Sequence, residues 1–95
     1  MTNYESGARL ERAVRDIYST RGYYCMRSAG SKGPADLHCA NEYLSVYIQC
    51  KRRGEDATEA MARMEREIPR GPSRRLEVWG PGPELLIAQD WIPEA

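Results

Sequence analysis

The side chains best suited to chemistry in this sequence are an aspartate, an amide and a lysine on two neighbouring apolar segments. Asp36 opens a short apolar segment, and Gln49 and Lys51 stand two residues apart at the end of the next one. Alternation along an extended strand puts Gln49 and Lys51 on one face. If the two segments pair as antiparallel strands, this end lies beside Asp36. A carboxylate, an amide oxygen and an ammonium are then expected to converge.

A second carboxylate can reach the same place from a helix. Glu11 precedes the apolar residues Val14 and Tyr18 by three and seven positions, which places it at the border of an apolar helix face. Oxygen ligands hold Mg²⁺, which makes hydroxide available and offsets charge on a phosphate, while Lys51 can orient the nucleophile or stabilise the transition state. The group indicates phosphodiester hydrolysis, with a solvated acid–base pair as the structural alternative.

Hydrophobic periodicity and turn-forming residues predict the elements that position these side chains. The predicted helices cover residues 7–20 and 58–67, and the predicted strands cover residues 23–27, 35–40, 43–51, 74–79 and 85–89. Ser6 is the predicted N-cap of the first helix. Asn41 and Glu42 are expected to join the second and third strands in a tight hairpin. We expect one domain over residues 1–95, because a chain this short cannot form two cores.

Charge and cysteine usage restrict the class of protein. The chain carries 14 Lys and Arg against 14 Asp and Glu, so no overall basic excess announces a nucleic-acid binder. Its three cysteines are odd in number and lack paired short spacing, which indicates buried reduced thiols rather than a disulfide framework or a zinc site. Without a signal peptide or a long apolar run, we expect a cytoplasmic protein with no membrane segment.

The segment from residue 28 to 34 is expected to be a loop, because it combines two glycines, two serines and a proline. Glycines allow the backbone to approach a phosphate, serine hydroxyls can donate, and Arg27 and Lys32 supply positive charge. The segment can therefore bind a phosphate. A polar turn without function is the alternative.

Four segments resemble the archaeal Holliday junction resolvases in order and spacing. They are residues 7–12 (GARLER), 26–32 (MRSAGSK), 35–37 (ADL) and 47–51 (YIQCK). Those enzymes belong to the PD-(D/E)xK nuclease superfamily. The resemblance, which covers the first half of the chain well, implies a restriction-endonuclease-like α/β fold. In that fold a mixed five-stranded sheet is flanked by helices in the order αβββαββ.

The resemblance also implies roles for the matching residues. The implied catalytic residues are Glu11, Asp36, Gln49 and Lys51, and the implied metal ligands are Asp36, Gln49, Glu11 and the backbone carbonyl of Cys50. The implied DNA contacts are Arg12, Arg27, Ser31, Lys32, Arg52 and Arg53. The cofactor is Mg²⁺, with Mn²⁺ as a substitute. Gln49 departs from the family pattern, because it replaces an acidic residue and, being neutral, holds a divalent cation less strongly.

The expected function is metal-dependent, structure-selective DNA cleavage. The resemblance favours a homodimer that resolves four-way (Holliday) junctions by paired symmetric nicks, in DNA recombination and repair. Two other functions stay open. One is a related PD-(D/E)xK nuclease acting on branched, flapped or nicked DNA, since one site serves many substrates. The other is a non-catalytic DNA-binding module whose site has degenerated at Gln49.

Overall fold

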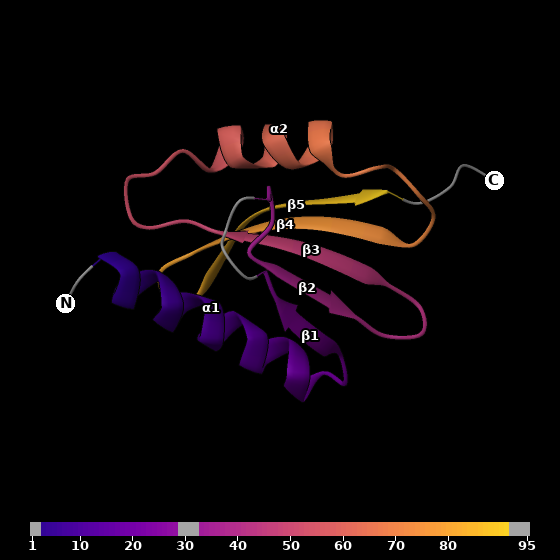
Figure 1. Cartoon of the computed structure of the whole chain (residues 1–95), viewed down its shortest axis with the longest axis horizontal. Helices are drawn as coiled ribbons and strands as arrows, with labels where there is room; N and C mark the ends of the chain where they lie inside the picture. Colours follow the sequence, from indigo (N-terminus) through magenta and orange to yellow (C-terminus); the bar gives the residue numbers. More distant parts are fainter. Residues whose placement is uncertain (1–2, 29–32, 92–95) are drawn as a thin grey trace.

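The computed structural model describes residues 3–28 and 33–91, with side chains described for residues 7–28 and 33–90, and has an α/β architecture (Figure 1). Its elements are α1 (Asn3–Thr20), β1 (Tyr24–Arg27), β2 (Leu37–Ala40), β3 (Ser45–Cys50), α2 (Ala57–Glu67), β4 (Arg74–Gly80) and β5 (Glu84–Trp91). This is the predicted αβββαββ order. The five strands form one mixed sheet in chain order, β1-β2-β3-β4-β5.

The predicted hairpin of the second and third strands is confirmed as the antiparallel pair β2–β3. Strand β3 begins two residues later than predicted, because the turn takes up residues 41–44 rather than 41 and 42, and β2 begins at Leu37 rather than at residue 35. The Asn41 side chain accepts hydrogen bonds from the N–H groups of Tyr43 and Leu44, each at 2.8 Å. The Asn41 N–H donates to the Leu44 carbonyl at 3.0 Å. An asparagine that bonds the following backbone in this way favours a turn over a strand.

The sheet is mixed because β3 and β4 run parallel, whereas β1–β2 and β4–β5 are antiparallel. Parallel neighbours need a crossover connection, and α2 provides it. The carboxyl ends of β3 and β4 therefore lie at the same edge as the residues before β2. Figure 1 shows this edge beside the amino-terminal half of α1.

Helix α1 begins at Asn3, so the prediction of Ser6 as its N-cap is wrong and Ser6 lies inside the helix. The apolar pattern that predicted the helix starts at Leu10, and a polar first turn leaves no periodic signal. At the other end, Gly22 adopts a φ of 89°, and the Tyr23 N–H donates to the Tyr18 carbonyl at 3.0 Å. This left-handed glycine ends the helix.

Helix α2 agrees with its prediction to within one residue. Asp56 is its N-cap, and the side chain accepts from the N–H groups of Thr58 at 2.9 Å and Glu59 at 3.3 Å. These bonds satisfy two donors that the first turn leaves without helical partners. In the part of the chain that the structure describes, no helix is long and apolar enough to cross a membrane.

Two clusters of buried side chains lie on opposite faces of the sheet. The first joins α1 to β2, β3 and β4 and contains Leu10, Val14, Tyr18, Leu37, Cys39, Val46, Ile48 and Trp79. The second joins α2 to β4 and contains Ala60, Met61, Met64, Ile68, Leu76 and Val78, with Tyr47 and Ile87 packed against it. Val46 and Ile48 alternate with Tyr47 along β3, which is why they face different helices.

Candidate active site

Asp36 lies directly before β2, where the pairing with β3 is irregular. Leu37 is the register partner of Ile48, yet the Asp36 N–H also donates to the Ile48 carbonyl at 2.8 Å. Two consecutive residues opposite one partner form a β-bulge, which redirects a side chain. Regular alternation therefore ends at Leu37 and does not set the direction of the Asp36 carboxylate.

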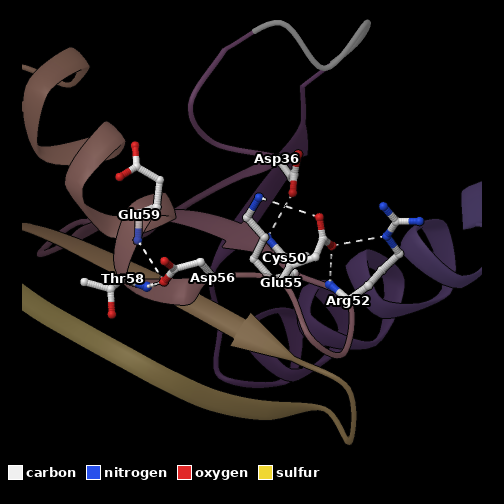
Figure 2. A network of polar contacts seen from close by, with 8 residues as sticks. Asp36, Cys50, Arg52, Glu55, Asp56, Thr58 and Glu59 are labelled. Carbon is white, nitrogen blue, oxygen red and sulfur yellow. Dashed lines mark hydrogen bonds and ion pairs between the residues drawn. The ribbon is translucent and has the colours of Figure 1, made fainter.

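The Asp36 carboxylate is fixed against the end of β3. Its Oδ2 accepts a hydrogen bond from the Cys50 N–H at 2.9 Å (Figure 2). Cys50 stands between Gln49 and Lys51, so this bond places Asp36 at the segment that carries both residues. The Asp36 carbonyl accepts from the Ser28 N–H at 2.8 Å, which attaches the end of β1 to the same place.

Three other charged residues act on Asp36. Burial has the largest effect and raises the pKa of Asp36, and the negative charge of Glu11 raises it further. The hydrogen bond from Cys50 and the positive charges of Lys51 and Arg27 act in the opposite direction. The resulting pKa is above the ordinary aspartate value. The charges of two other predicted site residues, Glu11 and Lys51, therefore act on Asp36.

Glu11 is buried, with 9% of its surface exposed, and it is held by an ion pair. The Arg27 Nε donates to the Glu11 Oε2 at 2.6 Å. The Arg27 side chain is 48% exposed, so it pairs with Glu11 at the border between core and solvent. Arg27, a predicted DNA contact, therefore interacts with both carboxylates of the site, because it pairs with Glu11 and also lowers the pKa of Asp36.

Glu55 is a member of this site that the sequence analysis missed. Its Oε2 lies 3.9 Å from the Lys51 Nζ. Its Oε1 accepts from the Arg52 backbone N–H at 2.7 Å and from the Arg52 Nε at 3.1 Å (Figure 2). The Arg52 backbone bond is the main cause of a lowered Glu55 pKa. The available signal was an acid three and four residues after two bases. Glu55 holds Lys51 and Arg52 in one turn.

Gln49 has a different environment. It alternates with Ile48 and Cys50, which pack towards α1, and its register partner Val78 packs beneath α2. Its side chain therefore belongs to the α2 face of the sheet. Within the described residues, no hydrogen bond joins the Gln49 amide to Asp36. The role of Gln49 as a metal ligand stays a prediction.

The remaining predicted site residues are divided between exposed positions and positions outside the described residues. Arg12 and Arg53 are exposed, as contact with DNA requires. Ser31 and Lys32 lie outside the described residues. Burial, followed by the charges of Asp36 and Glu11, raises the pKa of the Cys50 thiol, so this cysteine stays protonated beside the two carboxylates.

Two carboxylates, Asp36 and Glu11, act on each other in this site, whereas the third, Glu55, pairs with Lys51 and Arg52. In residues 3–28 and 33–91, no group of three or more His, Cys, Asp or Glu side chains is arranged to hold a metal ion. A cation at Asp36 and Glu11 would therefore need further oxygen ligands. The Gln49 amide and the Cys50 carbonyl are the predicted sources.

A second polar cluster lies on the α1 side of β4. Glu77 is 2% exposed and accepts from the Tyr18 hydroxyl at 2.5 Å, the Trp79 Nε1 at 2.8 Å and the Arg75 Nε at 2.6 Å. Arg75 also donates to Asp90 at 2.9 Å. These five residues line a cavity of about 510 Å³. Each buried charge is paired, so the cluster is a structural connection between α1 and β4.

Comparison with known proteins does not assign the chain to a family. No protein-family model matches the chain, and no curated protein matches it. The residues around Asp36 and the resemblance of the four segments are the indications of function.

Proposed function

We propose that this protein is a metal-dependent, structure-selective DNA endonuclease with a restriction-endonuclease-like PD-(D/E)xK core. The observation that carries the proposal is the Asp36 carboxylate, bonded to the Cys50 amide and acted on by the charges of Glu11 and Lys51. The αβββαββ order of the mixed sheet supports it. The resemblance to archaeal resolvases makes a four-way junction the first candidate substrate.

The residues present fit a divalent cation. Asp36 is removed from water and repelled by Glu11, so its ionised form is disfavoured until a positive charge offsets both effects. Asp36, Glu11 and the Cys50 carbonyl would hold Mg²⁺, or Mn²⁺ in its place, since hard cations take oxygen ligands, and the Gln49 amide would join them by turning from the α2 face. When bound, such a cation activates water and offsets charge on a phosphate.

The cationic side chains of the site act on the DNA. Lys51 places an ammonium near Asp36, where it orients the attacking water or stabilises charge that develops on the phosphate. Glu55 keeps Lys51 and Arg52 at the edge of the sheet. Arg12 and Arg53 contact the DNA backbone, which gives affinity with little sequence readout.

Cleavage of a panel of labelled substrates tests the proposal. A four-way junction, a flap, a fork, a nicked duplex and a linear duplex are incubated with the protein and Mg²⁺. We expect cleavage of the junction by paired nicks, loss of cleavage in Asp36→Asn, and full cleavage in the control Asp16→Asn, whose side chain is 73% exposed on α1. Cleavage that survives Asp36→Asn refutes the assignment of the site. Equal cleavage of linear duplex refutes the selectivity for branched DNA.

Paired nicks on a symmetric junction need two active sites, so we propose that the active form is a homodimer. Light scattering of the protein with and without junction DNA measures the mass of the complex. Two protein chains on each junction are expected. One chain on each junction, together with paired nicking, contradicts the dimer.

A non-catalytic DNA-binding module is the second candidate, and a specific observation favours it. Gln49 stands where the resembling nucleases carry an acid, and the group at Asp36 holds two carboxylates, Asp36 and Glu11. The variant Gln49→Glu separates the two functions, because a third carboxylate should increase the rate of Mg²⁺-dependent cleavage in a nuclease. If neither Gln49→Glu nor Asp36→Asn changes the cleavage rate while DNA binding persists, the binding module is favoured.

A further inference from the structure

Two cysteines face each other across the pairing of β1 with β2. Cys25 and Cys39 are register partners in this antiparallel pair. The same register sets Ser28 opposite Asp36, and the Ser28 N–H donates to the Asp36 carbonyl, so these two form a hydrogen-bonded pair. Hydrogen-bonded and non-hydrogen-bonded pairs alternate along the strands. Counting back three positions makes Cys25 and Cys39 a non-hydrogen-bonded pair.

This kind of pair has the spacing that a disulfide needs. Residues in a non-hydrogen-bonded pair have Cα atoms about 4.5 Å apart and side chains on the same face. Disulfides span Cα separations of about 4.4–6.8 Å. Cys39 is fully buried and Cys25 packs against the same core cluster. Burial raises the pKa of the Cys39 thiol, and a hydrogen bond with Cys25 raises it further.

We propose that Cys25 and Cys39 form an oxidisable dithiol that closes to a cross-strand disulfide when the protein meets a peroxide. The proposal is independent of the nuclease function. Cys25 reacts first because its side chain is partly exposed, whereas Cys39 is enclosed. Cys39 is then the resolving cysteine, already in place on the neighbouring strand.

The two steps balance with hydrogen peroxide as the oxidant. The Cys25 sulfur attacks a peroxide oxygen; an S–O bond forms, the O–O bond breaks, and the thiol proton leaves with the other oxygen as water. The Cys39 sulfur then attacks the Cys25 sulfur; the S–S bond forms and the S–O bond breaks. The leaving hydroxide takes the Cys39 proton as a second water. The dithiol loses two electrons and the peroxide gains them.

The third cysteine does not compete in this geometry. Cys50 lies on β3, four residues beyond Val46, which is the register partner of Cys39. The disulfide therefore has one expected connectivity. It would tie β1, a four-residue strand at one edge of the described sheet, to β2. Oxidation is expected to slow the local opening of this edge, since a covalent link removes conformations from the open state.

Intact-mass measurement after treatment with hydrogen peroxide tests the proposal on the full chain. The product should be a monomer that has lost two hydrogen atoms, and dithiothreitol should restore the original mass. Proteolysis without reduction should yield one linked peptide pair containing Cys25 and Cys39. The control variant Cys50→Ser should oxidise in the same way, whereas Cys25→Ser should not form an intramolecular disulfide.

Several results would overturn the proposal. One is an intramolecular link that includes Cys50, and another is a product that consists of disulfide-linked dimers alone. A third is sulfinic acid at Cys25 while Cys39 can still be alkylated in the unfolded protein. The linked peptides are identified in the unmodified sequence, so the test does not depend on whether the variant Cys39→Ala, which changes a buried residue, can fold. Hydrogen exchange gives a further readout, because unchanged protection of the β1 amides after oxidation contradicts the expected effect on the edge.

Discussion

Removal of the Tyr18 hydroxyl should measurably destabilise the protein. In the folded state this hydroxyl donates to the buried Glu77 carboxylate at 2.5 Å, and burial, followed by the bond to Glu77, raises the Tyr18 pKa so that the proton stays on the phenol. A hydrogen bond to a charged partner contributes about 1.5–3 kcal/mol. In Tyr18→Phe, Trp79 and Arg75 still donate to Glu77, so the carboxylate is not left unpaired. We therefore expect a loss of about 2 kcal/mol in the free energy of unfolding.

The free energy of unfolding is measured by urea denaturation monitored by circular dichroism, and thermal denaturation gives the melting temperature. For a domain of this size, about 2 kcal/mol corresponds to a fall of about 8–16 °C in the melting temperature. The matched control is Tyr23→Phe, which removes the same atom from a ring packed edge-on against Tyr18 at a centroid distance of 4.9 Å. The control should stay within about 0.5 kcal/mol of the native protein. If Tyr18→Phe stays within the same range, the charge-assisted bond does not stabilise the connection between α1 and β4.

Three further predictions concern the candidate site and the helix that follows it. Because the pKa of Asp36 is raised in the folded state, its contribution to stability is fully present below the ordinary aspartate pKa and is lost as the pH rises through the raised value. The free energy of unfolding, measured by denaturation at a series of pH values, should therefore fall with pH over this range in the native protein and not in Asp36→Asn. Equal pH dependence in the two proteins would contradict the prediction. Glu11→Gln removes a charge that raises the Asp36 pKa, so an NMR titration should show that pKa falling, and an unchanged value would mean the two groups do not interact. Asp56→Ala removes the acceptor for the N–H groups of Thr58 and Glu59 and should cost about 1 kcal/mol in urea denaturation; an unchanged midpoint would show that the cap does not stabilise α2.

The order of the elements could be predicted because its signals are local. The apolar positions of α2 repeat within a few residues, and the predicted range 58–67 differs from Ala57–Glu67 by one residue. The hairpin β2–β3 was predicted from two apolar segments and a short polar turn. From that pairing it also followed that Asp36 and Lys51 lie at one end of the sheet. Periodicity did not predict the polar first turn of α1, where Ser6 was wrongly assigned as the cap.

The direction of the Asp36 side chain could not be predicted from the alternation of residues along a strand. Alternation assumes one residue opposite one residue, and the shared pairing of Asp36 and Leu37 with Ile48 breaks that assumption. The contact with the Cys50 amide follows from this irregularity. The ion pair of Glu11 with Arg27 could not be predicted from the sequence either, because it depends on how α1 lies against β1.

The sequence by itself determined which residues form helices and strands, and which polar residues stand at their ends, since backbone preference and side-chain periodicity act over neighbouring positions. Tertiary structure alone decided the partners of the buried acids. Glu77 lies within the predicted strand 74–79, and its environment depends on Tyr18, 59 residues away. The packing of α1 on the sheet brings these groups together, and a charge removed from water must be paired wherever its partner lies in the chain.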